Sequence, residues 1–424
     1  MAANRRTSLR WAAMRETHAM RRALRLARRG YGATAPNPMV GAVLIKGGAI
    51  IGRGWHRRAG GPHAEIEALR DATRRGHSPR GAVLYVTLEP CSTHGRTPPC
   101  TDAIIAAGIR RVVVGTVDPN PKHAGKGLKI LKRAGVGVVG GDEAAREPKA
   151  KSRKGPKATP PATSISAECR QLNEAFNHWI VHRTPFVTVK AAMTLDGKIA
   201  TASGESKWIT GAKARASGMK LRAGSDAILV GINTILADDP SLTVRGKEEG
   251  RRRKGAERRM RRMVLDAMAR TPLNAKVVSD EHAALTTIVV SRQAPRRRVA
   301  ALRKRVRLVV APIKVGWPVT DRPRRARSAA PYPTIDLRWL VKKLGAEEVT
   351  SLLVEGGGEV NASFLEGGLA QRVAFFQAPK ILGGRDARRG VAGEGAKKLS
   401  EVIPLREVKW RRLGEDLLLT ARVD

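Results

Sequence analysis

A change of composition near the middle of the 424-residue chain constrains its fold most strongly. Residues 144–163 are rich in Lys, Pro, Ala and Ser and carry no apolar period, which is typical of a linker or an insertion. On either side, short apolar runs alternate with segments of helical period. This order predicts two α/β units, each built on a sheet covered by helices. We therefore expect a first domain over residues 14–143, a basic linker over residues 144–166 and a second domain over residues 167–424.

The apolar patterns also predict individual elements. In the first block the expected helices are Thr17–Arg29, Ala64–Thr73, Thr101–Ala107 and Leu128–Arg133, and the expected strands are Met39–Ile45, Ile50–Gly54, Val83–Thr87, Arg111–Gly115 and Val136–Val139. In the second block we expect one helix over Glu168–His182, a helical stretch at Asn361–Leu365, and strands at Phe186–Ala192, Ala227–Val230, Met263–Leu265, Thr287–Val290, Leu308–Val310, Ser351–Val354, Val373–Gln377 and Leu417–Ala421. The weakly patterned basic stretches 245–262 and 318–332 are expected to be loops.

The formal net charge of +43 is the most unusual property of the composition. Such a field attracts polyanions, so nucleic-acid binding is one interpretation. Aromatic residues make up only 4% of the chain, which leaves few platforms on which bases could stack. We favour an arginine bias on solvated loops and helix faces, and expect no nucleic-acid partner. The basic residues are densest in Arg251–Arg262, Arg296–Arg307 and Arg322–Arg327.

The small number of cysteines and the lack of long apolar runs indicate where in the cell the protein is expected to be. Two of the three cysteines fall in one short motif, so they do not form a disulfide framework. No apolar run reaches the length of a membrane span. Residues 1–15 carry arginines without the apolar core of a signal peptide, and a frayed N-terminus is favoured over a short transit segment. We expect a cytoplasmic protein without membrane contact.

A histidine, two cysteines and a glutamate form the sharpest local pattern. His63 and Glu65 stand in a His-x-Glu sequence, Cys91 follows a proline, and Cys100 comes nine residues later. A catalytic zinc ion takes three protein ligands and keeps a fourth position for water, whose pKa it lowers toward neutrality. His63, Cys91 and Cys100 supply one nitrogen and two sulfurs. Glu65 is placed to carry the proton of water to a leaving amine, as in the zinc deaminases of nucleobases.

Simpler interpretations exist for each of these residues alone. A histidine before a helix is usually structural, and two cysteines can be buried as small apolar residues. The order of the three ligands after a strand favours the zinc site over these alternatives. The segment Ser92–Pro99 makes the cysteine spacing longer than the usual Cys-x-x-Cys, and we expect it to influence substrate choice rather than zinc binding. Cys169 is interpreted as an ordinary buried thiol.

Further motifs in the first block belong to a recognisable pattern. They are Asn37–Val43, Gly54–His56, His63–Glu65, Glu89–Cys100 and Asp118–Pro121. Together they resemble the bifunctional deaminase–reductase of riboflavin biosynthesis, and the long segment between the two cysteines is that family's own mark. The resemblance implies a cytidine-deaminase-like fold with one Zn²⁺. It also implies the substrate, 2,5-diamino-6-ribosylamino-4(3H)-pyrimidinone 5′-phosphate, which loses its 2-amino group as ammonia.

By the same resemblance four residues become candidates for the substrate pocket, namely Asn37, His56, His94 and Asn120. The alternative is that the two asparagines are turn residues and the two histidines lie on the surface.

The second block resembles the reductase domain of the same family. The matching segments are Lys190–Ala200, Ser203–Thr210, Leu221–Arg222, Gly231–Arg245, Val354–Gly358 and Pro379–Gly384. The resemblance implies a dihydrofolate-reductase-like fold in which NADPH delivers hydride to C1′ of the ribose and opens it to a ribityl chain. It also implies a homodimer or higher oligomer as an option.

The resemblance assigns contacts residue by residue. Those to the cofactor fall on Ala192, Trp208, Thr234, Asp238, Gly357, Gly358, Glu359, Val360, Asn361, Ala362 and Ser363. Those to the substrate fall on Ser206, Arg222, Leu242, Arg245 and Glu355. Arg222 and Arg245 suit a 5′-phosphate, because a guanidinium binds phosphate oxygens in pairs. The alternatives are solvated surface arginines and, for Asp238, a turn before a strand instead of a proton donor.

The second block also departs from the family pattern. Gly356–Gly358 suits a phosphate after a strand, but it is not a Gly-x-Gly-x-x-Gly fingerprint and could be a plain turn. Ala267 stands where a small polar residue is expected, and Gln371–Arg372 replaces an expected acidic pair. These departures leave open a deaminase with an impaired reductase domain. The net charge of +43 and the shared His-x-Glu chemistry leave open a zinc deaminase acting on a nucleic-acid base.

Overall fold

The computed structural model describes residues 16–94, 98–140, 165–245, 260–314 and 334–423. It divides into two compact units, Met1–His182 and Arg183–Asp424, each with its own sheet. The two expected α/β units are therefore confirmed. The expected linker lies almost wholly outside the described residues, as does the basic stretch 318–332.

Within its described residues the first unit contains a five-stranded sheet and six helical segments. Its strands are β1 (Gly41–Lys46), β2 (Ala49–Trp55), β3 (Val83–Val86), β4 (Arg111–Val114) and β5 (Gly137–Gly140). Its helices are a segment over residues 16–27 continued by η1 (Arg28–Gly30), and α2 (Ala64–Arg74), α3 (Cys100–Ala106), α4 (Lys126–Arg133), α6 (Ile165–Leu172) and α7 (Glu174–His182).

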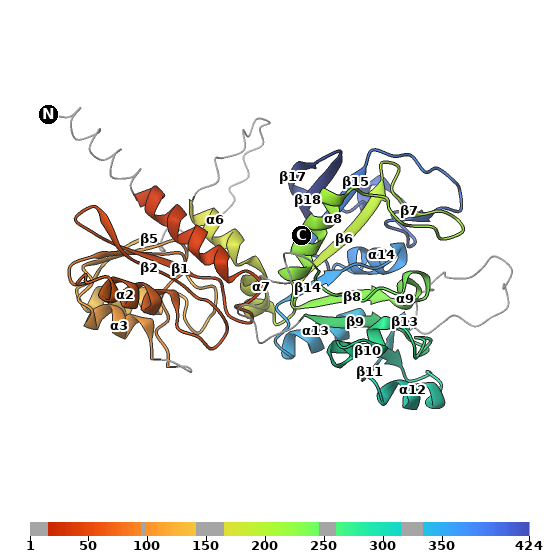
Figure 1. Cartoon of the computed structure of the whole chain (residues 1–424), viewed down its shortest axis with the longest axis horizontal. Coiled ribbons are helices and arrows are strands. Elements are labelled where there is room, and N and C mark those ends of the chain that lie inside the picture. The colour runs from red at the N-terminus through yellow and green to blue at the C-terminus, as the bar shows by residue number, and fades with distance from the viewer. Residues whose placement is uncertain (1–15, 95–97, 141–164, 246–259, 315–333, 424) are drawn as a thin grey trace. The chain divides into compact units, whose positions relative to one another are not determined.

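The strands of this sheet follow the order β2-β1-β3-β4-β5. β1 is antiparallel to both β2 and β3, whereas β3, β4 and β5 are parallel. Because side chains alternate along a strand, Ala42 and Leu44 pack with α2, α3 and α4, while Val43 packs with the helix over residues 16–27. Figure 1 shows this arrangement, with α2 and α3 on one face and the helix over residues 16–27 and α6 on the other.

The boundary between the units differs from the expected one at residue 167. Both α6 and α7 belong to the first unit. Cys169 of α6 is fully buried in the cluster that the helix over residues 16–27 forms on the sheet. The expected single helix over Glu168–His182 is interrupted at Asn173. The side chain of this asparagine accepts a hydrogen bond from Met39 N at 2.8 Å and donates one to Met39 O at 2.9 Å.

The second unit is built on a nine-stranded sheet. The strands of this sheet are β6 (Phe186–Thr194), β8 (Ala227–Gly231), β9 (Arg261–Leu265), β10 (Thr286–Ser291), β11 (Arg307–Ala311), β14 (Ser351–Val354), β15 (Arg372–Ala378), β17 (Arg406–Leu413) and β18 (Asp416–Arg422). Two small ribbons pair β7 (Lys198–Ala200) with β16 (Arg388–Arg389) and β12 (Ile313–Lys314) with β13 (Thr334–Ile335). The helices are α8 (Ala212–Ala223), α9 (Ile232–Asp238), α11 (Lys276–Ser279), η2 (Ala283–Leu285), α12 (Arg296–Arg303), α13 (Leu337–Ala346), α14 (Gly358–Glu366) and η3 (Leu399–Glu401).

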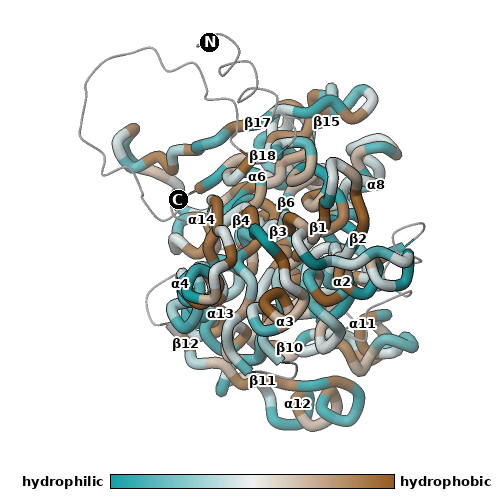
Figure 2. The backbone as a smooth tube through the Cα atoms, turned by 90° about the vertical axis from the view of Figure 1, so that its left-hand side faces the viewer, coloured by the Kyte–Doolittle hydropathy of each residue, from teal (hydrophilic) through white to brown (hydrophobic). Residues whose placement is uncertain are grey.

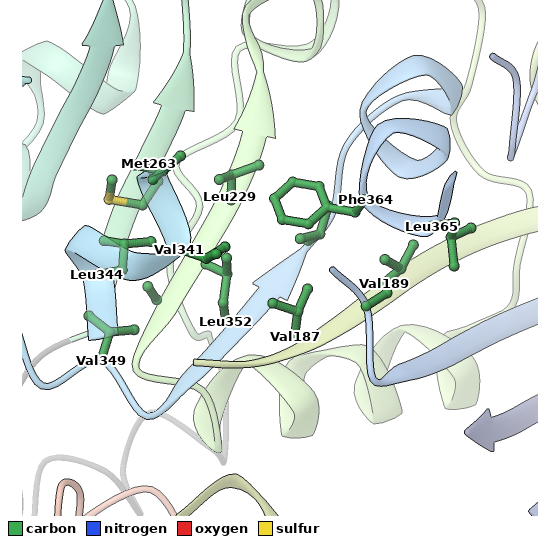
Figure 3. Packing of buried hydrophobic residues seen from close by; sticks show 14 of the residues in the cluster. Val187, Val189, Leu229, Met263, Val341, Leu344, Val349, Leu352, Phe364 and Leu365 are labelled. Atoms are coloured by element: carbon green, nitrogen blue, oxygen red, sulfur yellow. The ribbon is translucent and has the colours of Figure 1, made fainter. Parts of the chain in front are cut away.

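The order of this sheet is β11-β10-β9-β8-β14-β6-β15-β18-β17, and its first seven strands are parallel. β18 and β17 close one edge as antiparallel strands. Parallel strands need crossover connections, which the helices supply, and such a sheet is buried on both faces. One face packs against α13 and α14, where Figure 3 shows Phe364 beside Val189, Leu229 and Leu352. The other face packs against α9, α11 and α12.

Two features of the second unit differ from the sequence expectations. The stretch 245–262 is not a loop to its end, since Arg261 and Arg262 begin β9 and Arg262 is almost entirely buried. The strand β17 was not expected, and its side chains are exposed at nearly every position. In Figure 2 the hydropathy changes between teal and brown over short stretches of the tube, as amphipathic elements require. Among the described residues, no helix is both long and apolar enough to cross a bilayer.

Candidate zinc centre and reductase site

Three residues of the first unit converge in the way that the sequence predicts for a metal site. His63 caps the N-terminus of α2, Cys91 follows β3, and Cys100 is the first residue of α3. The Nδ1 atom of His63 lies 3.5 Å from the Sγ of Cys91 and 3.3 Å from the Sγ of Cys100. All three ligand atoms lie within 4.8 Å of one another. One nitrogen and two sulfurs at this separation fit a tetrahedral zinc ion that keeps one position open.

The protonation of the three ligands also suits a cation. The Cys100 thiol hydrogen bonds to Cys91 and lowers the pKa of Cys91 to about 4, and His63 adds to this effect. In return, Cys91 raises the pKa of Cys100. The hydrogen bond between Cys91 and His63 raises the pKa of His63. Cys91 therefore forms a thiolate readily, and the sulfur of Cys100 lies next to it. A divalent ion here replaces the shared protons, which is how thiol sites bind zinc.

Glu65 lies beside this group without being part of it. It is in the first turn of α2, two residues after His63, and only 3% exposed. Burial raises its pKa to about 7, although His63 acts in the opposite direction. A carboxyl group with such a pKa exchanges protons near neutral pH, as a general acid–base requires. A dication bound at the three ligands would favour the ionised form, which accepts a proton.

His56 adjoins the metal group, and Asn37 is hydrogen bonded to His56. The His56 ring is buried and stands edge-on to that of His63, with centroids 5.4 Å apart. Its Nδ1 lies 3.0 Å from the carbonyl oxygen of Pro62, so this nitrogen carries the proton and donates it. Its Nε2 then accepts from the Asn37 amide at 3.2 Å. Burial lowers the pKa of His56, which keeps the ring neutral. The alternative of a surface histidine is wrong for His56.

The other two pocket candidates are placed differently. His94 is exposed, next to residues 95–97, which lie outside the described part of the chain. Asn120 is half-buried in a turn after β4, where its Oδ1 accepts a hydrogen bond from Lys122 N at 3.0 Å. A role for Asn120 as a turn residue is therefore visible, and a substrate contact remains a prediction for both.

Glu89 is a residue to which the sequence analysis gave no role. Its buried carboxylate accepts hydrogen bonds from three backbone N–H groups, those of Asp118 at 3.2 Å, Gly125 at 2.9 Å and Gly127 at 2.9 Å. It thereby ties the loop before α4 to the segment that carries Cys91. The signal in the sequence is an acidic residue two positions before a metal ligand, at the end of a strand.

In the second unit, Arg222 and Glu355 form a paired group. The guanidinium donates from Nε at 2.9 Å and from Nη2 at 2.8 Å to the two oxygens of Glu355, and from Nη1 to Thr243 O at 3.1 Å. Lys190 Nζ lies 3.6 Å from the same carboxylate. Burial opposes ionisation of Glu355, but Arg222 and Lys190 outweigh it and lower its pKa to about 2. Arg222 is therefore a buried and oriented cation, and its alternative as a solvated surface arginine is wrong.

The remaining substrate candidates come from two stretches of chain, one before α8 and one after α9. Ser206 Oγ donates to Asp238 Oδ1 at 3.1 Å, which joins two residues predicted to contact different ligands. Leu242 is buried and has a positive φ of 50°, and Arg245 is exposed at the end of the described segment.

The cofactor candidates are spread over three elements and one loop. Ala192 lies on β6, Trp208 is exposed before α8, and Thr234 and Asp238 lie on α9. The remaining seven form the N-cap and first turns of α14. In this group Gly357 has open space where a side chain would stand, and a Cβ on Gly358 would overlap Arg389 O. Bare backbone at the start of a nine-residue helix fits the phosphate of a dinucleotide such as NADPH.

Within that group the burial is uneven. Asn361 and Ala362 are buried, and the other members of residues 357–363 are partly exposed. The Nδ2 of Asn361 donates to Gly390 O at 2.8 Å, while its buried Oδ1 has no hydrogen-bond partner among the described residues. An acceptor without a donor at this place fits the approach of a further polar group.

Comparisons with known proteins agree with this geometry. The model of the RibD C-terminal domain matches residues 185–419, and that of the cytidine and deoxycytidylate deaminase zinc-binding region matches residues 14–116. The riboflavin biosynthesis protein RibD of Aquifex aeolicus is 39% identical over 400 residues, covering 94% of this chain and 96% of its own length. RibD of Escherichia coli is 38% identical over 406 residues, covering 96% of this chain and 99% of its own length.

Solved structures give the same result. RibD of Acinetobacter baumannii matches with a TM-score of 0.76 and 32% identity, over 97% of this chain and 99% of that chain. A diaminohydroxyphosphoribosylaminopyrimidine deaminase/5-amino-6-(5-phosphoribosylamino)uracil reductase from Thermotoga maritima matches with a TM-score of 0.74 and 32% identity over the same shares. Both units thus have relatives in one protein, in the same order.

Proposed function

Since the chain belongs to the RibD family of riboflavin biosynthesis enzymes, we propose that it catalyses two consecutive reactions that begin with 2,5-diamino-6-ribosylamino-4(3H)-pyrimidinone 5′-phosphate. The first unit removes the 2-amino group as ammonia, and the second uses NADPH to reduce the ribosyl group to a ribityl chain. The observation that supports the first step most directly is the convergence of His63, Cys91 and Cys100 beside buried Glu65. That set has the composition of a zinc deaminase site.

In the proposed deamination, His63, Cys91 and Cys100 hold zinc, which when bound makes water nucleophilic near neutral pH. Glu65 accepts the proton of the attacking water and passes it to the departing amine, so that the ring gains oxygen and ammonia leaves. Neutral His56 fixes the Asn37 amide through its Nε2, and that amide is proposed to meet the polar edge of the pyrimidine. Because neither His56 nor Asn37 is charged, neither residue takes up the proton that Glu65 transfers to the amine.

In the proposed reduction, NADPH supplies the hydride, and residues of this chain fix the positions of donor and acceptor. The start of α14 receives a phosphate of the cofactor, with Ala192, Trp208 and Thr234 as further contacts. Arg222, which Glu355 and Thr243 orient, and Arg245 receive the 5′-phosphate of the substrate. Asp238, to which Ser206 donates, is proposed to protonate or orient the opening ribose.

The partners and location are part of the proposal. We propose no nucleic-acid partner, and a homo-oligomer that uses the edge strand β17. In support, Val408 and Trp410 of that strand are exposed at 47% and 56%, and exposed strand edges favour pairing. A cytoplasmic location agrees with cysteines that are all free thiols.

The test follows ammonia and NADPH absorbance together while the zinc-loaded protein acts on the diaminopyrimidinone ribosyl phosphate. Ammonia release followed by NADPH consumption is expected. A parallel reaction with a single-stranded RNA or DNA oligonucleotide measures the rival deaminase activity. Ammonia from the oligonucleotide but not from the nucleotide would overturn the substrate, and ammonia without NADPH loss would leave a deaminase with an impaired reductase.

A further inference from the structure

Arg262 in β9 is 1% exposed although it follows a strongly basic stretch of sequence. A buried guanidinium destabilises a fold unless its charge is paired and its N–H groups are hydrogen bonded. Here each of the five N–H groups has an acceptor. These are Thr286 Oγ1 at 2.9 Å, Ser241 O at 2.8 Å, Asp280 Oδ2 at 2.6 Å, Asp280 Oδ1 at 2.7 Å and Val277 O at 3.1 Å.

Asp280 supplies the countercharge and fixes the plane of the guanidinium. Its two oxygens accept from Nη1 and Nη2 in a paired arrangement, which is the most directional contact that an arginine makes. Burial works to raise the pKa of Asp280, but Arg262 outweighs it and the pKa lies below its usual range. Asp280 therefore stays ionised at neutral pH, and Arg262 has a single orientation.

The acceptor Ser241 O belongs to a different part of the unit from the other four. It lies between α9 and the exposed Arg245, in a segment where Asp239 and Leu242 have positive φ values of 39° and 50°. Side chains other than glycine adopt this conformation reluctantly, and it persists only where neighbouring contacts hold it. Arg262 Nη1 donates a hydrogen bond to Ser241 O, and Lys276 N donates one to Asp239 Oδ1 at 2.8 Å.

The same segment carries the polar groups of the reductase site. Thr243 O accepts from Arg222, which is paired with Glu355, and Asp238 at the start of the segment accepts from Ser206. A shift of the Ser241 carbonyl would therefore move groups on both sides of it.

We propose that Arg262 is a positioning residue of the reductase. Through the Ser241 carbonyl it holds residues 242–245 in the shape that receives the phosphorylated ribose of the substrate. It does not touch the substrate itself, because its own donors are all used within the fold. The inference rests on the proposed function, which assigns Leu242, Arg222 and Arg245 to that substrate.

The test compares Arg262→Lys with the matched variant Thr286→Val in the full, zinc-loaded chain. Lysine keeps the charge, but its single ammonium group cannot bind Ser241 O and both oxygens of Asp280 as a planar fork does. Thr286→Val removes the acceptor of Nε on the side away from Ser241. Each protein is given the deaminated phosphorylated substrate, and KM, kcat and the thermal midpoint are measured. Ammonia release from the diaminopyrimidinone nucleotide, measured separately, is the internal control.

Arg262→Lys is expected to raise KM for the phosphorylated substrate about 10- to 100-fold with kcat, NADPH KM and ammonia release nearly unchanged. Thr286→Val is expected to lower the thermal midpoint and leave KM as in the wild type. A folded Arg262→Lys protein with normal KM would overturn the inference, as would an equal rise of KM in both variants.

Should Arg262→Lys not fold, Asp280→Asn takes its place, because it turns an amide N–H₂ toward the guanidinium and loosens it from Ser241. The same rise in KM is expected, and a normal KM again overturns the role of Arg262. A wild-type chain that releases ammonia from the diaminopyrimidinone nucleotide but consumes no NADPH with the deaminated substrate would overturn the proposed reduction itself, and this role with it. The wild-type result therefore separates the two failures.

Discussion

Glu65 is a buried carboxyl group beside three metal-binding side chains, with a pKa of about 7. Replacement by glutamine keeps its shape and removes its ability to carry a proton. Glu65→Gln is therefore expected to slow ammonia release by about 10²- to 10⁴-fold, the usual contribution of a general acid–base. Zinc content, measured by metal analysis, and NADPH consumption with deaminated substrate are the controls, and both should equal the wild type. Deamination at the normal rate in this variant would remove Glu65 from the mechanism.

The Arg222–Glu355 pair predicts how the second unit responds to acid. The pKa of Glu355 is about 2, since Arg222 and Lys190 outweigh burial, whereas a glutamate in an unfolded chain titrates near about 4.3. With the folded value below the unfolded one, the stabilisation is fully present above about pH 4.3 and is lost as the pH falls toward 2. The free energy of unfolding of wild type and Glu355→Gln, measured in urea, should therefore differ most near neutral pH and converge in acid. A difference that stays constant with pH would contradict this assignment.

At this scale the sequence predicted best where the chemistry demands one residue type. The proposed zinc ligands and Glu65 stand out in the sequence because metal binding and proton transfer leave few choices of side chain. Glu89 and Arg262 were not, since each acts by hydrogen bonding to backbone groups far away in the sequence. The basic sequence around Arg262 predicted a loop, and only the fold brings Asp280 and Ser241 into contact with it.

At the level of elements, α14 gives a matched pair of glycine substitutions. A Cβ at Gly358 would overlap Arg389 O, whereas one at Gly357 meets nothing within 4 Å. Gly358→Ala is expected to displace the 389–392 segment from the start of the helix and to raise KM for NADPH by about tenfold, or about 1.4 kcal/mol. Gly357→Ala adds the same methyl group at the neighbouring position without that overlap, so its effect on the KM for NADPH should be much smaller. Steady-state titration of NADPH measures both, and equal effects would contradict the steric argument.

Strands with a buried face were predictable, but the amphipathic helix α13, which buries Leu340, Val341 and Leu344, was not predicted. Apolar periods located the strands of both sheets, with ends displaced by one or two residues. β17 was missed because Arg406–Leu413 mixes charged and apolar residues and is exposed at nearly every position, so it carries no burial pattern. The break at Asn173 was missed because its cause is a pair of hydrogen bonds to Met39, 134 residues away.

For the molecule as a whole, the two activities should be separable by removing one metal. The zinc ligands all belong to Met1–His182, and the Arg222–Glu355 pair belongs to Arg183–Asp424. Chelation of zinc is expected to abolish ammonia release and to leave NADPH consumption unchanged when deaminated substrate is supplied. Restoring zinc should restore ammonia release. Parallel loss of both activities on chelation would show that the second unit also depends on the metal.

The whole-molecule predictions rested on composition and on motif order. The change at residues 144–163 separated two α/β units, and the paired resemblances gave the family, which the comparisons confirm. The boundary was placed too early, because α6 buries Cys169 in the first unit and a helix pattern does not reveal which core it joins.

The strand order of the second sheet has a consequence for the newborn chain. β6 lies between β14 and β15, so Phe186–Thr194 gains its neighbours only after Ser351–Val354 and Arg372–Ala378 have been translated. At usual translation rates this delay is roughly 10 to 30 seconds. The first unit, complete at His182, has its whole sheet before that wait begins. The ribosome therefore carries a finished deaminase unit together with an apolar strand that has no partner yet, and this interval is when the chain depends most on chaperones.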